Sequence, residues 1–150
     1  MDGSDDAKRA AARVLDLQEP GVTKIAAFHS YEHHMIPRTI PLTVPNINPT
    51  IYTIPGAEYS KIAEQYKQLG QRILKETKEL FLNADIEIET RLIADEEPED
   101  YINRITKEEN FDLVVLGCKG DHSKLKQIFM GSVAQKVLNS DTPADILTVR

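Results

Sequence analysis

Two short runs of uninterrupted apolar residues limit the fold of this chain more than any other feature. Residues 25–28 read Ile-Ala-Ala-Phe, and residues 113–116 read Leu-Val-Val-Leu. Such runs are typical of strands that are buried on both faces, as in a parallel sheet. We expect strands over residues 22–30 and 111–116. Two more are predicted at residues 85–93, where apolar and charged positions alternate at a half-exposed edge, and at residues 144–150.

Helical patterns lie between these strands. Ser4 is a suitable N-cap, and Asp5 and Asp6 follow it in the first turn, where the helix dipole favours acids. Strands that alternate with helices predict an α/β fold, an open parallel sheet with helices on both faces. The length of 150 residues suits one domain, residues 1–150. Helices are expected over residues 4–17, 59–82, 98–109 and 131–139.

The segment from residue 31 to residue 57 interrupts this alternation. It holds five of the eight prolines. Because proline lacks an N–H donor and restricts the residue before it, neither a long helix nor a central strand fits here. The segment is nevertheless apolar, and two interpretations stay open. Either this proline-rich loop docks on a neighbouring subunit or a ligand, or it covers the core of its own domain.

Charge and cysteine content exclude several classes of protein. The chain has 18 Lys and Arg against 24 Asp and Glu, so binding to nucleic acid through its phosphates is not expected. Cys118 is the only cysteine, which fits a reducing compartment. No apolar run approaches the roughly 20 residues of a membrane helix, and the acidic start does not resemble a signal peptide. We therefore expect a cytoplasmic protein with no membrane partner.

A glycine-bearing loop carries the clearest functional signal. It begins where the strand at residues 111–116 ends, and open parallel sheets bind ligands at that end of their strands. Gly117 and Gly120 let the backbone approach a ligand, while Gly131, Ser132 and Val133 offer N–H groups where a helix begins. The pattern predicts a phosphate or nucleotide site, with plain turn and cap chemistry as the alternative. It is neither a P-loop nor the dinucleotide-binding glycine motif.

The letters around these glycines resemble a known family. GCKG at residues 117–120 and GSVAQKVL at residues 131–138 are similar to the C-terminal signature of the universal stress protein family, G-x2-G-x9-G-S/T. DGS at residues 2–4 resembles the turn after the family's first strand, and FHS at residues 28–30 resembles the end of its second. The resemblance implies a five-stranded parallel sheet of order 3-2-1-4-5 that binds ATP.

The resemblance also implies which residues form the site. Asp2 and the backbone of Ser30 would lie at the adenine, and Gly117 at the ribose. No catalytic residue and no metal-ligating side chain are implied, since Mg2+ or Mn2+ would be bound through the phosphates. A homodimer is expected through the last strand, Ala144 to Arg150. The phosphates would be held by Gly120, Gly131, Ser132 and Val133.

Four departures from the family pattern accompany this resemblance. The spacer between Gly120 and Gly131 has ten residues instead of nine, and Glu96 and Asp145 stand where the family has Gly and Pro. The fourth concerns the central strand, since the sequence starts at the DGS turn that follows the family's first strand. We expect either that an upstream segment is missing from this sequence or that a borrowed strand, residues 49–55, rearranges the sheet. In the first case no ladder would join the second and fourth family strands.

Three functions follow from these features. The leading hypothesis is an ATP-binding universal stress protein, a nucleotide-responsive regulator with little or no hydrolysis. A dimeric stress protein that works through protein contacts without nucleotide is the second, and the long spacer and absent strand favour it. A slow ATPase is the third, although no residue presents itself as a general base.

Two further groups of residues have more than one interpretation. His33 and His34 are adjacent in the proline-rich loop, where a solvated pair is favoured over a zinc site. His29 matches the histidine at the end of the family's second strand and is expected to be structural. Cys118 lies between two glycines of the motif, and it either fills a tight loop or acts as a redox-sensitive thiol.

Overall fold

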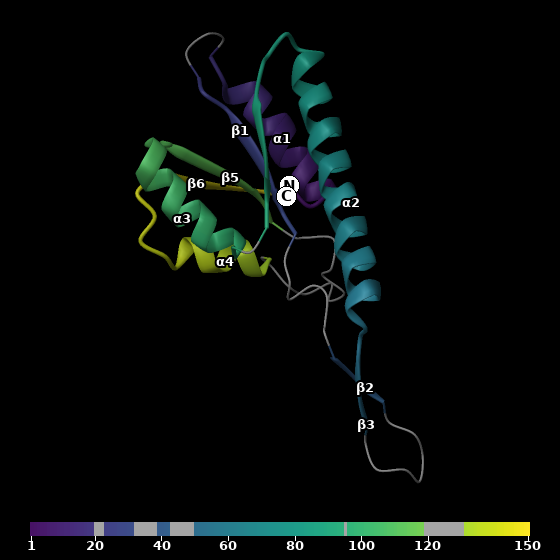
Figure 1. Cartoon of the computed structure of the whole chain (residues 1–150). Helices are drawn as coiled ribbons and strands as arrows, with labels where there is room; N and C mark the ends of the chain where they lie inside the picture. The colour runs from purple at the N-terminus through teal and green to yellow at the C-terminus, as the bar shows by residue number, and fades with distance from the viewer. Residues whose placement is uncertain (20–22, 32–38, 43–49, 95, 119–130) are drawn as a thin grey trace.

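The computed structural model of the chain describes residues 1–19, 23–31, 39–42, 50–94, 96–118 and 131–150. The elements lie in the order helix, three strands, helix, and then strands and helices in alternation (Figure 1). No helix in this described part is long and apolar enough to cross a membrane. The elements are α1 Asp5–Leu17, β1 Ala26–Ser30, β2 Thr39–Leu42, β3 Thr50–Thr53, α2 Gly56–Leu82, β4 Glu89–Ile93, α3 Pro98–Glu109, β5 Leu113–Gly117, α4 Ser132–Leu138 and β6 Asp145–Val149.

The parallel strands form two separate pairs. β1 pairs with β4, from Ala26 opposite Glu89 to Ser30 opposite Ile93. β5 pairs with β6, from Leu113 opposite Asp145 to Gly117 opposite Val149. Within the described ranges, no ladder joins β1 to β5. In the strand order 3-2-1-4-5, the second strand pairs with the third and the fourth pairs with the fifth, and β1–β4 and β5–β6 correspond to these two pairs. The expected gap between the second and fourth family strands is confirmed for the described residues.

The edge of β1 that faces away from β4 is where this interruption lies. The N–H of Glu89 donates to the carbonyl of Ile25, and the N–H of Tyr31 donates to that of Ile93. Because backbone groups alternate between the two edges of a strand, the carbonyl of Phe28 points away from β4. It accepts a hydrogen bond from the amino group of Met1. Residues 1–2 therefore lie beside the end of β1.

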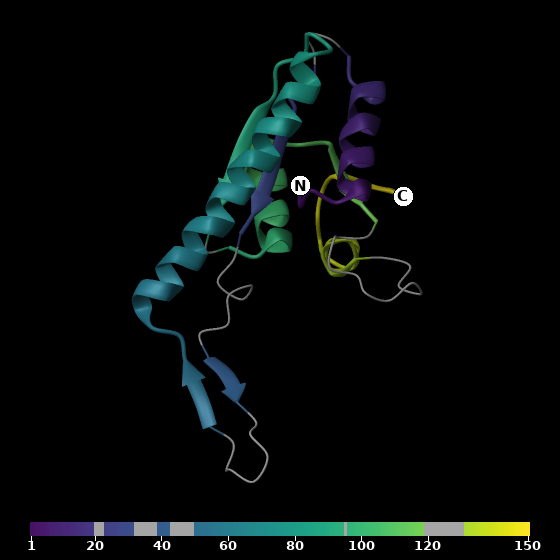
Figure 2. The same ribbon diagram turned by 90° about the vertical axis from the view of Figure 1, so that its right-hand side faces the viewer.

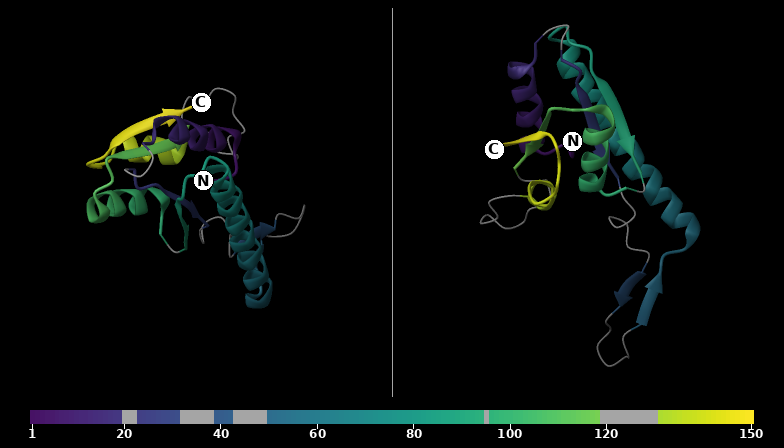
Figure 3. Two further views of the ribbon diagram at one scale, coloured as in Figure 1. Left: turned by 90° about the horizontal axis from the view of Figure 1, so that it is seen from above. Right: turned by 90° about the vertical axis from the view of Figure 1, so that its left-hand side faces the viewer.

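Helices cover both faces of the strands. On β1, the buried His29 faces α2, since a Cβ at Gly70 would lie 2.5 Å from its ring. The preceding residue, Phe28, contacts the ring of Tyr101 of α3, with ring centroids 4.8 Å apart and the ring planes tilted by 49°. Successive strand residues point to opposite faces, so α2 and α3 cover opposite faces of β1. α1 packs on α2 and β5, and α4 packs on α3 (Figure 3).

The core lies between the helices α1 and α2 and the strand β1. Ala11 of α1, Phe81 of α2 and Ile88 form its centre, and Ala27 of β1 packs against them. Helical spacing in the sequence places Leu69 and Leu80 on the face of α2 that packs on the sheet. This prediction is wrong for these two residues, which are 44% and 39% exposed. The residues next to them, Gly70 and Phe81, are buried instead. The small Gly70 faces β1 because only a residue without a side chain leaves room for the ring of His29. The buried residues of α2 are Gly70, Ile73, Leu74, Thr77 and Phe81.

Part of the proline-rich loop is ordered as a hairpin of its own. The alternative that residues 49–55 form a strand borrowed by the parallel sheet is therefore wrong for residues 50–53. β2 and β3 pair in antiparallel register, with Thr39 opposite Thr53. The hairpin lies beyond the first turn of α2, at an angle to the helix, and points away from the rest of the molecule (Figure 2). Its strands contact each other and make no extensive contact with another described element. The expectation that this segment covers its own core is therefore wrong for residues 39–42 and 50–53.

We call the hairpin strands together with residues 56–69 of α2 the arm, and the remaining described residues the body. Every buried residue of α2 lies at Gly70 or later, so none belongs to the arm. The helix also begins at Gly56, three residues before the predicted start, directly after Pro55 as N-cap.

Candidate functional site

The carboxyl ends of β1 and β5 bring most of the predicted site residues to one edge. Ser30 closes β1 and Gly117 closes β5. The carbonyl of Met1 accepts a hydrogen bond from Nδ1 of His29, which holds the neighbouring Asp2 near the end of β1. A continuous series of contacts runs from here through the start of α1 to Gly117 and on to the start of α4.

Asp2 shapes the turn that starts α1. Its Oδ1 accepts from the N–H of Ser4 at 3.0 Å and from the Ser4 hydroxyl at 2.7 Å. Ser4 in turn caps the helix by accepting from the N–H of Ala7, as predicted. Gly3 has a φ of 82°, a conformation that side chains rarely allow, so the DGS turn depends on its glycine. One Asp2 oxygen is thus engaged within the turn.

His29 fits its predicted structural role. Its side chain is buried beneath α2 and bonded to the carbonyl of Met1. Burial lowers the pKa of the ring, and the bond to Met1 only partly opposes that shift. A neutral imidazole held in this way orients the end of β1.

Gly117 has a structural reason to be glycine. A Cβ at this position would lie 2.8 Å from the N atom of Ala7 and 2.8 Å from the carbonyl carbon of Asp6. Both are backbone atoms of α1 and cannot swing aside. The first turn of α1 therefore packs directly on the end of β5, which brings the DGS turn close to the glycine loop.

The start of α4 returns to the same point. The N–H of Gly131 donates to the carbonyl of Cys118 at 2.5 Å, so that donor is already used within the protein. This corrects the expectation that all three N–H groups of Gly131, Ser132 and Val133 are free. Ser132 is exposed at the first position of α4. Gly120 and the rest of residues 119–130 lie outside the described part of the chain, as do His33 and His34.

The donors at this edge suit a phosphate better than a metal ion. The exposed Ser132 hydroxyl and the first N–H groups of α4 are neutral donors, which favour an anion. Among the described residues, no group of three or more His, Cys, Asp or Glu side chains could hold a metal ion. A divalent ion accompanying a nucleotide here would take its ligands from the phosphate oxygens. Cys118 itself is buried, 2% exposed.

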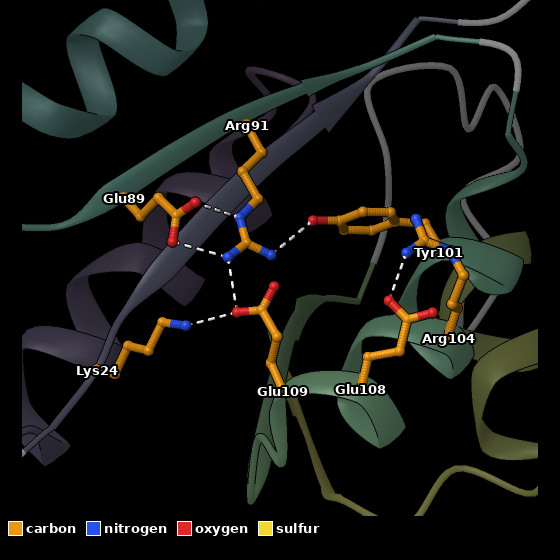
Figure 4. A network of polar contacts seen from close by, with 7 residues as sticks. All are labelled: Lys24, Glu89, Arg91, Tyr101, Arg104, Glu108 and Glu109. Atoms are coloured by element: carbon orange, nitrogen blue, oxygen red, sulfur yellow. Dashed lines mark hydrogen bonds and ion pairs between the residues drawn. The ribbon is translucent and has the colours of Figure 1, made fainter.

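A network of charged residues below this edge was missed by the sequence analysis (Figure 4). Arg91 of β4 bonds both carboxylate oxygens of Glu89 at 2.7 Å, Glu109 at 2.8 Å and the Tyr101 hydroxyl at 3.1 Å. Lys24 adds a second bond to Glu109. The alternation of Glu89 and Arg91 on one face of a strand was visible in the sequence. The hydrogen bond of Arg91 to Glu109, which lies 18 residues later in the chain, could not be seen in the sequence.

The network fixes α3 to the first strand pair. The bonds from Arg91 and Lys24 lower the pKa of Glu109 to about 2, and the carboxylates raise the pKa of Arg91. Lys24 and Arg91 also lie within 5.2 and 5.9 Å of the centre of the Phe111 ring. These contacts hold the end of α3 and the start of β5 against β1 and β4. The network thereby supports the candidate site without forming part of it.

A second group of charges ties α3 to α4. Lys136 of α4 pairs with Glu99 and lies 3.9 Å from Glu97. Both acids lie at the start of α3, where the helix dipole alone would favour them. The pairing with Lys136 adds a tertiary role, because it positions α4 and therefore Ser132 at its start.

Comparison with known proteins agrees with this arrangement. A sequence model of the universal stress protein family matches residues 1–150. No curated protein matches the chain. Among solved structures, the hypothetical protein MJ0577 is similar with a TM-score of 0.77 and 16% identity, over 99% of this chain and 90% of that one.

Two further solved structures are similar. The universal stress protein UspA from Lactobacillus plantarum has a TM-score of 0.74 and 16% identity, over 100% of this chain and 93% of that one. A universal stress protein family member from Burkholderia pseudomallei has a TM-score of 0.63 and 18% identity, over 99% and 90%. At these identities the structures speak for the fold, an α/β arrangement of parallel strands and helices. Since the family model covers every residue, the chain belongs to the universal stress protein family.

Proposed function

We propose that this chain binds ATP at the edge formed by the ends of β1 and β5. Membership of the family implies a role in the stress response. The observation that supports the finer proposal is the meeting of Asp2, Ser30, Gly117 and Ser132 at that one edge. Open parallel sheets bind ligands in this position, and the start of a helix favours an anion there.

Each predicted contact has a place in this proposal. The DGS turn and the end of β1 would take the adenine through Asp2 and the Ser30 backbone. Gly117 would lie at the ribose. The phosphates, with Mg2+ or Mn2+, would lie against Gly120, Gly131, Ser132 and Val133, where Gly131 contributes its close backbone approach more than its N–H.

The proposed role is regulation rather than catalysis. His29 is buried and bonded to Met1, so it is not available as a general base. Hydrolysis would therefore be slow. The single cysteine, the buried Cys118, is compatible with a reducing compartment, and the cytoplasm is the location that we propose.

A homodimer through β6 belongs to the same proposal. Within the described strands, β6 pairs only with β5, so its second edge can pair with the same strand of another copy. Antiparallel pairing of two β6 strands would join two candidate sites, because Cys118 donates from its N–H to Val149 of β6 at 2.7 Å. The predicted mass in solution is that of at least two chains.

Thermal unfolding with millimolar ATP and Mg2+ tests the binding proposal. ATP should raise the melting temperature, because a ligand that binds only the folded state stabilises it. Gly131→Val should abolish the shift, and Ser132→Ala should reduce it. Gly56→Val and Ser60→Ala, both on the arm, are matched controls that should keep the full shift. No shift for the unchanged protein would contradict ATP binding.

A nucleotide-independent interaction protein is the second candidate. The use of the Gly131 N–H by Cys118 favours it, because one predicted phosphate donor is already paired. Native mass spectrometry of the purified protein separates the two functions. Co-purified adenine nucleotide supports the first candidate, and a nucleotide-free dimer whose melting temperature ATP does not change supports the second.

A further inference from the structure

We propose that the arm is an interface for a second copy of this chain, formed by antiparallel pairing of two β3 strands. β3 runs from Thr50 to Thr53 at the edge of a two-stranded hairpin. The pairing would create a four-stranded antiparallel sheet across a two-fold axis. This interface is separate from the pairing of β6, which lies in the body.

The isolation of the hairpin is the first argument. A two-stranded hairpin alone is marginally stable in water and normally needs a third strand or a packed face. Here β2 and β3 make no extensive contact with another described element of their own chain (Figures 1 and 2). No described element of the chain supplies a third strand, and an identical hairpin from a second copy can supply one.

The side chains of β3 give the second argument. Ile51 is 70% exposed, the highest value among the exposed large apolar residues of the described chain, and its neighbour Tyr52 is 43% exposed. Successive strand residues point to opposite faces, so both faces of the hairpin present an apolar side chain to solvent. Pairing across β3 would give each of these side chains an apolar cross-strand neighbour from the second copy.

The lack of charged residues in the hairpin indicates which partner fits its edge. Residues 39–57 contain no Asp, Glu, Lys or Arg, the longest such stretch in a chain that is 28% charged. Natural sheet edges are usually protected by charged side chains, and this edge has none. In a two-fold pair each charged side chain would lie close to a like charge, which destabilises the pairing of two identical edges. The uncharged hairpin avoids this repulsion, so it suits pairing with a second copy of itself.

The two strands of the hairpin are not equivalent. β2 contains Pro41, which has no N–H to donate to a neighbouring strand. β3 contains no proline, so each of its residues has both a donor and an acceptor. Its edge is therefore the one on which pairing can be complete. Antiparallel pairing of two β3 strands makes the same contacts twice, as a two-fold interface requires.

Substitution on β3 tests the proposal. Ile51→Lys places a positive charge on each strand of the pair, and the mass of the assembly by light scattering should fall at least twofold. Leu82→Lys is the matched control, because Leu82 is 49% exposed at the far end of α2 and should leave the mass unchanged. An unchanged mass for Ile51→Lys, or a monomeric unchanged protein at all concentrations, overturns the proposal.

Cross-linking provides a test that does not depend on mass. In a Cys118→Ala background, single cysteines are placed at Ile51, Tyr52 and Thr53, and at Leu82 as the control. Oxidation should yield a covalent dimer from at least one β3 position and none from Leu82→Cys. Both results are independent of ATP, so failure here leaves the proposed function intact. Absence of a covalent dimer at all three β3 positions overturns the pairing.

Discussion

The two ends of α2 belong to parts of the molecule with opposite construction. In the body, Phe81 is 2% exposed and Gly70 lies directly on His29 and Leu92. In the arm, the same helix buries no residue, and the hairpin before it leaves Ile51 70% exposed. Both parts have regular secondary structure. The comparison shows that regular hydrogen bonding defines the elements of this protein, while side-chain burial decides which of them stabilise its fold.

Truncation of a core side chain should give the largest difference in the free energy of unfolding between a substitution in the body and one in the arm. Phe81→Ala should lower the free energy of unfolding by about 3–5 kcal/mol, because it leaves a cavity beneath α1 and α2. Ile51→Ala in the arm should change it by less than about 0.5 kcal/mol. Urea unfolding at a protein concentration low enough to prevent association measures both. Equal effects of the two substitutions would contradict the division into body and arm.

Overpacking at Gly70 should have the next largest effect. A Cβ there would lie 2.5 Å from Cδ2 of His29 and 2.7 Å from Cδ1 of Leu92, so valine must displace both side chains. Gly70→Val should lower the free energy of unfolding by about 1–3 kcal/mol, even though valine removes a flexible glycine from a helix. If this variant unfolds at the same urea concentration as the unchanged protein, the close contact between α2 and β1 is wrong.

Acid should weaken the body through Glu109. The pKa of this carboxyl is lowered to about 2 in the folded protein, from an ordinary value of 4.5. A lowered pKa stabilises the fold above the ordinary value, and this contribution is lost as the pH falls from about 4.5 towards 2. Glu109→Gln should therefore be less stable than the unchanged protein at pH 7, and the difference should shrink below pH 4.

Urea unfolding at several pH values between 7 and 3 measures this difference. Glu58→Gln in the arm is the control, because no ion pair is described for Glu58, and its stability should follow that of the unchanged protein. A constant difference for Glu109→Gln across this range would contradict the role of the network.

The smallest effect is expected at the base of the arm. A Cβ at Gly56 meets no atom within 4 Å, so Gly56→Ala should raise the free energy of unfolding slightly, by about 0.5 kcal/mol or less. Thermal unfolding of both variants measures this: the melting temperature should rise slightly for Gly56→Ala and fall for Gly70→Val, although both glycines belong to α2. A clear loss of stability for Gly56→Ala would mean that the start of α2 is packed.

Local signals predicted the body well and the arm poorly. α3 was expected over residues 98–109 and is found there, because Pro98 opens it and Asn110 ends it in a left-handed conformation. A strand within residues 49–55 was considered, but its pairing with residues 39–42 was missed. The prolines argued against a second strand there, and only the pairing of residues far apart in the loop reveals the hairpin. Leu69 and Leu80 were assigned to the buried face by spacing, but the approach of β1 at Gly70 turned that face.

The candidate site was predictable in its residues and not in its bonding. The motif and the turn identified Asp2, Gly117 and Ser132, and the strand ends bring them to one edge. Sequence spacing could not show that Gly131 donates to Cys118, or that Gly117 is required by the backbone of α1. The bonds of Arg91 to Glu109 and Tyr101 were equally hidden, since they join separate elements.

The unburied first half of α2 has a further consequence for two acidic molecules that associate. Residues 56–69 form fourteen helical residues, which span about 21 Å at 1.5 Å per residue. Two chains paired along their β3 strands would keep their bodies roughly 40 Å apart, twice the length of this helical segment. The Debye length at physiological ionic strength is about 8 Å, so the net charges of the two bodies would be almost completely screened from each other. The reach of the helix would then let a strongly acidic protein self-associate without any change to its charged surface.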